Sequence, residues 1–160
     1  MVLRGTDTVG KKFDLTFTVL GKPEPAGSKK GFYNQRMRRV IITDANKDSR
    51  GWKNQVAELA HQAMGGRKPF SGPLEVTFMF FVQRPQGHYG KGKNAEKVKA
   101  SSPVYPTVKP DVLKLARGVE DAMTSIVYRD DSLIVEEHIS KLYGEPERVE
   151  VYVRVLDSDS

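Results

Sequence analysis

Alternation of apolar and polar residues divides the chain into short predicted strands. The segment FDLTFTVL at 13–20 alternates with the period of two that one face of a sheet requires. The run LEVTFMFFV at 74–82 is the most apolar and is predicted to be the central strand. A short strand is expected at 40–43. Two further strands, at 133–142 and 149–156, are expected to pair through the turn-forming residues 144–147.

Two segments instead have the signals of helices. The first runs from Gly51 to Met64, with Asp48 or Ser49 as its cap and Gly65 after its end. The second runs from 111 to 124, directly after a proline. The predicted order is therefore β-β-α-β-α-β-β. It indicates an α+β fold in which two main helices pack on a mixed β-sheet, within one domain spanning residues 1–160.

A long polar stretch at 84–108 interrupts this order. It contains prolines, glycines and four lysines, namely Lys91, Lys93, Lys97 and Lys99. Loops of about 25 residues are unusual in a compact domain and are often functional. The stretch is predicted to be a mobile basic loop.

Charge and composition narrow the class of partner. The 160 residues carry a net charge of +6 with a pI near 9.5, which favours a polyanion such as nucleic acid. Cysteine is absent, so neither a disulfide framework nor a thiolate metal site is expected, as is usual in a reducing cytoplasm. No apolar run approaches about 18 residues, so no membrane span is predicted.

The cationic residues gather in three places, and each is a candidate for phosphate contacts. In the first, Phe32 and Tyr33 interrupt the cations, so an aromatic ring there could stack on an unpaired base. The alternative is an exposed, solvated loop. The candidate DNA-binding residues are Lys29, Lys30, Arg36, Arg38, Arg39, Lys91, Lys93, Lys109 and Lys114.

Three aspartates flank the second predicted helix. Asp111 stands at its start, and Asp130 and Asp131 follow its end. Clustered carboxylates repel one another unless a cation lies between them, and Mg²⁺ or Mn²⁺ is the usual hard cation. In a basic chain this pattern favours metal-assisted cleavage of a phosphodiester. The structural alternatives are a helix cap at Asp111 and a solvated turn at the later pair.

The same residues carry a resemblance to a known family. The runs KPDVLKLARGVEDAM and TSIVYRDDSLIVE resemble the signature of RusA-type Holliday-junction resolvases, crossover-junction endodeoxyribonucleases common in phages and prophages. The family pattern reads Lys-Pro-Asp-x-Asp-Asn-Leu-x-Lys, then Asp-Ala-Leu, then an aromatic residue before Asp-Asp. The matching residues are Lys109, Pro110, Asp111, Leu115, Asp121, Ala122, Tyr128, Asp130, Asp131 and Ser132.

This resemblance implies a specific activity. A RusA-like protein would be a homodimer that binds four-way DNA junctions in recombination and repair, in a bacterial or phage-infected cytoplasm. Each subunit would cut one strand with Mg²⁺ or Mn²⁺. Carried over residue by residue, Asp111 and Asp131 are the metal ligands, Asp130 is close by, and Arg117 takes the place of an assisting lysine.

One departure from the family pattern bears directly on activity. The second aspartate of the motif falls on Leu113, which cannot bind a metal, and the following position holds Lys114. Glu120 stands where an apolar residue is common, on roughly the same helical face as Leu113 but about 10 Å further along the axis.

Other acidic residues are expected to have structural roles or to approach the site. Asp121 is expected to pair with Arg117, four residues earlier. Glu136 and Glu137 are expected on opposite faces of one strand, so one of them could approach the site.

Three readings of function follow. The leading one is a junction endonuclease. The second is a junction-binding protein of the same fold whose cleavage is impaired by Leu113. The third is a basic phage DNA-binding or packaging protein without enzymatic activity.

Overall fold

The computed structural model describes residues 10–27, 29–44 and 48–157. A four-stranded sheet forms its centre, in the order β1 (Leu15–Leu20), β6 (Arg148–Val155), β4 (Leu74–Val82) and β5 (Ile134–Tyr143). The pairing of β4 with β5 is parallel, and the other two pairings are antiparallel. The sheet is therefore mixed, and β4 occupies an interior position as its apolar run predicts.

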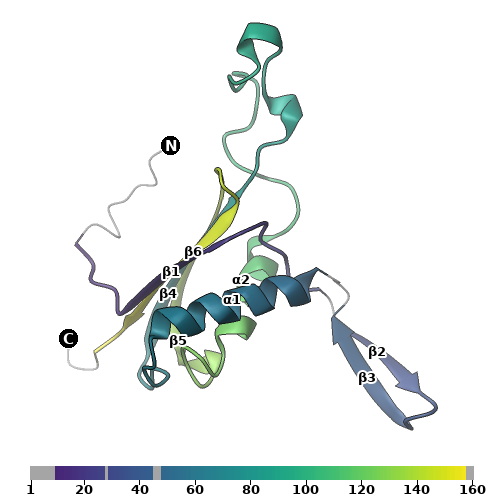
Figure 1. Ribbon diagram of the computed structural model, residues 1–160, viewed down its shortest axis with the longest axis vertical. Helices are drawn as coiled ribbons and strands as arrows, with labels where there is room; N and C mark the ends of the chain where they lie inside the picture. Colours follow the sequence, from purple (N-terminus) through teal and green to yellow (C-terminus); the bar gives the residue numbers. More distant parts are fainter. Residues whose placement is uncertain (1–9, 28, 45–47, 158–160) are drawn as a thin grey trace.

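Two helices cover one face of this sheet (Figure 1). Helix α1 (Ser49–Met64) contacts β1, helix α2 (Val112–Met123) contacts β5, and the two helices contact each other. Alternate residues of β4 point into this layer, where Val76, Phe78 and Phe80 are fully buried. The α+β class and the order of the predicted elements are confirmed.

Two expectations about strands need correction. The strands β5 and β6 do not pair with each other, because β4 lies between them and pairs with both. Residues 29–34, which the sequence analysis treated as a basic segment without predicting a strand, form β2 (Lys29–Asn34), which pairs with β3 (Arg39–Asp44). Basic residues obscured this strand because they remove the apolar alternation on which its prediction would rest.

The ends of the two helices are capped in different ways. Asp111 caps α2, since its Oδ2 accepts a hydrogen bond from the backbone N–H of Lys114 at 3.2 Å. At α1 the N-cap position is Asp48, but its side chain makes no capping hydrogen bond. Gly65 ends α1 at φ 58°, a left-handed conformation that glycine adopts without steric cost.

Two segments project from the body (Figure 1). One is the hairpin β2–β3. The other, residues 84–108, is called the arm here and contains the 3₁₀ turns η1 (Gln86–His88) and η2 (Gly92–Asn94). Its backbone is paired internally, with Gly90 N–H donating to Lys97 O at 2.9 Å and Lys99 N–H to His88 O at 2.8 Å. The arm is thus a structured projection, and its mobility in solution stays a prediction.

Because Phe78 is fully buried at the centre of β4, its replacement tests the core directly. Phe78→Ala is expected to lower the free energy of unfolding by about 3–5 kcal/mol, through lost apolar burial and the cavity left behind. Urea unfolding followed by circular dichroism measures this loss. Leu20→Ala, at an exposed position, serves as the control and should change the free energy by less than about 0.5 kcal/mol. An equal effect of the two substitutions would contradict this description of the core.

Candidate active site around helix α2

Helix α2 places the predicted catalytic residues by burying one side of itself. Leu115, Val119 and Met123 are fully buried against the sheet and α1. The opposite side carries the exposed residues Leu113 and Arg117. Asp111 caps the first turn, so the helix holds its carboxylate at a defined point.

A loop packed on α2 fixes the helix further. Ala26 N–H donates a hydrogen bond to Lys114 O at 2.9 Å. Gly118 permits this close approach, because a Cβ at that position would lie 3.3 Å from Glu24 O. The segment before the helix is tied to β5, where Lys141 Nζ donates to Val108 O at 2.6 Å and to Pro110 O at 2.8 Å.

Asp130 and Asp131 lie at the start of the 3₁₀ turn η3 (Asp131–Leu133), which leads directly into β5. Asp130 Oδ1 accepts from Ser132 N–H at 2.8 Å. Hydrogen bonds from the Ser132 side chain and backbone hold the pKa of Asp130 below its ordinary value. Asp130 therefore stays ionised and shapes the turn that presents Asp131.

Three carboxylates influence one another where α2 faces β5. Burial raises the pKa of Glu120 to about 8, and the hydrogen bond and charge of Glu137 and the charge of Asp131 add to this effect. Burial also raises the pKa of Tyr128, and the charge of Glu120 reinforces it. Tyr128 Oη donates to the backbone oxygen of Glu120 at 2.9 Å, which anchors the end of the helix.

The negative charge gathered around Glu120 marks a region where a cation would be favourable. Carboxylate oxygens are the ligands that Mg²⁺ and Mn²⁺ prefer, so the donor set fits the predicted metals. The sequence analysis considered Glu120 and Glu137 separately. It could not place them together because they come from different elements, 17 positions apart in the chain.

The ammonium group of Lys114 lies beside the carboxylate of Asp111. Lys114 Nζ lies 3.9 Å from Asp111 Oδ1, in addition to the capping bond from the Lys114 backbone. The predicted pairing of Asp121 with Arg117 needs correction, since Asp121 Oδ2 instead accepts from Lys53 Nζ of α1 at 3.3 Å. This pair joins the two helices, and the charge of Asp121 also helps to raise the pKa of Glu120.

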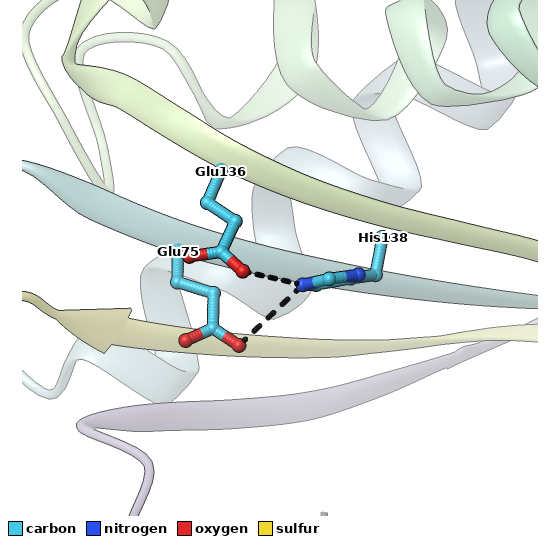
Figure 2. Close-up of side chains that lie close together, drawn as sticks. All are labelled: Glu75, Glu136 and His138. Atoms are coloured by element: carbon cyan, nitrogen blue, oxygen red, sulfur yellow. Dashed lines mark hydrogen bonds and ion pairs between the residues drawn. The ribbon is translucent and has the colours of Figure 1, made fainter. Parts of the chain in front are cut away.

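Glu136 and Glu137 do point to opposite faces of β5. Glu137 lies by Glu120, whereas Glu136 joins Glu75 and His138 on the sheet face away from the helices (Figure 2). His138 Nε2 is 3.0 Å from Glu136 Oε1 and 3.8 Å from Glu75 Oε1. The ligand atoms of these three residues lie within 4.8 Å of one another, so the group has the geometry to hold a metal ion.

Sequence reasoning assigned no metal partner to His138, because Glu75 lies on a separate strand. The charge around Glu75 explains why a cation is less favoured there. Glu75 is only 2% exposed, and its carboxylate forms ion pairs with Lys11 Nζ at 3.1 Å and with the Arg154 guanidinium. Burial alone would raise the pKa of Glu75, but the hydrogen bonds and charges of Arg154 and Lys11 outweigh it and lower the pKa. Both oxygens already face cations, so we assign this group a structural role.

The predicted DNA-binding residues occupy three separate places. Arg36 and Arg38 are exposed in the turn between β2 and β3, and Lys91 and Lys93 are exposed on the arm. The remaining described residues, Lys109 and Lys114, are exposed beside Asp111. The side chains of Lys29, Lys30 and Arg39 lie outside the described part of the structure.

Comparison with known proteins identifies the family. Residues 22–154 match the family Endodeoxyribonuclease RusA. The chain is also 34% identical over 147 residues to the uncharacterized protein YqaN of Bacillus subtilis (strain 168), covering 90% of this chain and 98% of YqaN. The chain therefore belongs to the RusA endodeoxyribonuclease family, and the predicted resemblance is confirmed.

Membership defines the class of protein. RusA proteins are nucleases that resolve Holliday junctions, bind branched DNA and generally depend on divalent metal ions. Within the described residues, no helix is both long and apolar enough to cross a bilayer.

The raised pKa of Glu120 predicts a specific pH dependence of stability. In the unfolded chain Glu120 loses its proton near its ordinary pKa of 4.5, whereas in the folded protein it keeps the proton up to about pH 8. Between these values the folded state binds more protons, so its stability falls as the pH rises. Glu120→Gln should therefore raise the melting temperature at pH 8 by about 2–4 °C, equivalent to about 1 kcal/mol, and the gain should vanish near pH 4.5.

Thermal unfolding in EDTA at several pH values measures this difference. Glu58→Gln, at an exposed position on α1, controls for the loss of one negative charge. A gain that is the same at pH 4.5 and pH 8 would show that Glu120 does not titrate in this way.

Proposed function

We propose that this chain is a metal-dependent endonuclease that binds four-way DNA junctions as a homodimer and resolves them by paired strand cleavage. The observation that supports this most directly is the arrangement at α2. Asp111 caps α2, and Asp131 adds negative charge near Glu120, where this helix faces β5. Family membership supplies the class of reaction.

In this proposal Asp111 and Asp131 hold Mg²⁺ or Mn²⁺. The cation would neutralise charge at the scissile phosphate and lower the pKa of the attacking water. Asp130 keeps the turn before β5 in shape through Ser132, which positions Asp131. Arg117, exposed on α2, stabilises negative charge that develops on the phosphate; it remains protonated and so does not act as a base.

DNA binding would come from the predicted cationic residues. The arm contributes Lys91 and Lys93, the β2–β3 turn contributes Arg36 and Arg38, and the strands themselves contribute Lys29, Lys30 and Arg39. Lys109 and Lys114 would contact phosphates next to the catalytic aspartates. The hairpin and the arm project from separate parts of the body, which suits a substrate with several duplex arms (Figure 1).

A second function is favoured by one specific feature, the substitution at Leu113. This side chain is 66% exposed where the family motif has an aspartate, and the Lys114 ammonium lies 3.9 Å from Asp111. Both changes make the site less negative. The alternative is a junction-binding protein that cleaves slowly or not at all.

Binding to branched DNA is expected to be selective and steeply salt-dependent, because Lys and Arg release counterions from phosphates. Competition between a four-way junction and a linear duplex of equal length measures the preference. Replacing Lys91 and Lys93 by alanine should reduce the slope of log affinity against log salt by about 1 for each lost phosphate contact. Lys68→Ala, an exposed lysine outside the predicted surface, is the matched control. Equal affinity for junction and duplex would defeat the junction assignment.

Restoring the motif aspartate tests cleavage separately from binding. The unmodified chain is expected to cleave junctions much more slowly than relatives with the full motif. Leu113→Asp should raise the cleavage rate by at least about ten-fold, since it adds an anionic oxygen ligand. It should change junction affinity by less than about three-fold, because phosphate contacts elsewhere supply most of that affinity. Cleavage in Mg²⁺ and in Mn²⁺, with EDTA as the blank, measures the effect.

Leu113→Asn is the control for this substitution, because it has the size of aspartate without the charge. Robust metal-dependent cutting by the unmodified chain, with no gain from Leu113→Asp, would contradict the prediction. Glu120 would then be the first residue to examine as a relocated ligand, since it lies in the repulsive carboxylate group on the helix side of the sheet. Glu136 is less suitable, because it lies on the opposite face with His138.

A further inference from the structure

A pocket of about 160 Å³ lies at the base of the arm, directly before Asp111. Its walls come from the ends of β4 and β5, from both ends of the arm and from the loop after β1. The apolar part of the lining consists of Pro23, Val82, Pro85, Pro106, Val108, Pro110 and Tyr143. Lys22 and Lys109 are exposed at its rim.

We propose that this pocket receives one unpaired base of the DNA, while Lys22 and Lys109 contact the phosphates on either side of it. This inference rests on the proposed function, because it requires a DNA strand beside Asp111. It adds to that function a way of recognising the branch point. At a junction, bases next to the crossover can leave the stack at a lower cost than bases inside a duplex.

The size and chemistry of the pocket fit a base. A cavity of about 150 Å³ with apolar walls is sufficient for one benzene ring, so the pocket suits a single aromatic ring better than two fused rings. Bases have apolar faces that stack on apolar and aromatic side chains regardless of sequence. Polar groups are also present for the edge of a base, since Gln83 and Glu147 line the pocket. The lysine rim complements the charge of a phosphate backbone and disfavours a cationic occupant.

The pocket is held in shape before any ligand binds. Lys141 Nζ bridges the carbonyl oxygens of Val108 and Pro110, which joins the end of the arm to β5. At the other end of the arm, the Arg84 guanidinium lies 4.3 Å from the centre of the Tyr143 ring and donates to Pro103 O at 2.7 Å. Four prolines in the wall restrict the backbone further. A preformed pocket loses little conformational entropy on binding, which strengthens association.

A base-deletion scan with the full-length chain tests the proposal. Four-way junctions carry a single abasic site at each position flanking the branch point, and binding is measured in EDTA. For the unmodified chain, removal of the base at one position should weaken binding by roughly ten-fold, the loss of one stacked base. Val108→Phe fills the pocket from a side chain that is 65% exposed, so it leaves the core intact. It should weaken binding to the intact junction and abolish the sensitivity to the abasic site.

Two controls make the result specific. Val104→Phe places the same ring at another exposed position of the arm, away from the pocket lining, and should behave like the unmodified chain. Lys22→Met and Lys109→Met should weaken binding to intact and abasic junctions by the same factor, because phosphate contacts are independent of the base. Thermal unfolding confirms that each variant is folded.

The proposal is overturned if no position shows a loss on base removal, or if the loss is unchanged in Val108→Phe. Junction preference over linear duplex is measured in the same titrations, so a failed pocket with intact preference leaves the proposed function standing. If junction preference itself is absent, the pocket is tested on a short oligothymidylate and its fully abasic counterpart. If the abasic oligonucleotide binds more weakly and Val108→Phe removes this difference, the pocket binds a base without junction specificity. If the two oligonucleotides bind equally, the base-pocket proposal is overturned.

Discussion

The packing of α2 between the sheet, α1 and the loop after β1 is the constraint on which the candidate site depends. Its buried residues, Leu115, Val119 and Met123, leave the helix only one orientation. That orientation turns Leu113 and Arg117 outward and brings Glu120 toward β5. The Tyr128 hydroxyl and the Lys141 ammonium then tie the two ends of the helix region to backbone oxygens. Apolar burial therefore sets the geometry of the polar residues.

Charge is distributed differently on the two faces of the sheet. On the outer face, the buried carboxylate of Glu75 is matched by Lys11 and Arg154, so the group that includes His138 is close to neutral. On the helix face, burial together with the hydrogen bond and charge of Glu137 raises the pKa of Glu120. This imbalance is common where a protein binds a cation or a reacting group rather than where it stabilises its own fold.

The arm and the β2–β3 hairpin both project from the body of a small basic domain (Figure 1). The base of the arm is anchored through Arg84 and Lys141. Under the proposed function, the exposed part of the arm would contact phosphates, and its anchored base would hold the base pocket. Phosphate contacts need only charge and reach, whereas a base pocket needs walls that stay in place.

The sequence by itself determined the class of fold, the positions of both helices and the central strand, and the family. These follow from local signals, namely apolar periodicity at Leu74–Val82, the capping aspartate before α2 and the spacing of the Lys109–Pro110–Asp111 and Asp130–Asp131 motifs. It also showed the departure at Leu113. Such features are encoded within a few neighbouring residues, so they can be read without knowledge of the rest of the chain.

Only the tertiary structure decided which distant residues meet. The placement of β4 between β5 and β6, the pairing of Asp121 with Lys53, and the meeting of Glu120 with Glu137 all join separate elements. The group of Glu75, Glu136 and His138 and the pocket beside Asp111 likewise draw on segments far apart in the chain. Strand order and helix rotation are set by the summed packing of the whole core. A local sequence pattern does not encode the packing of the whole core. Small changes in that packing would bring different side chains together.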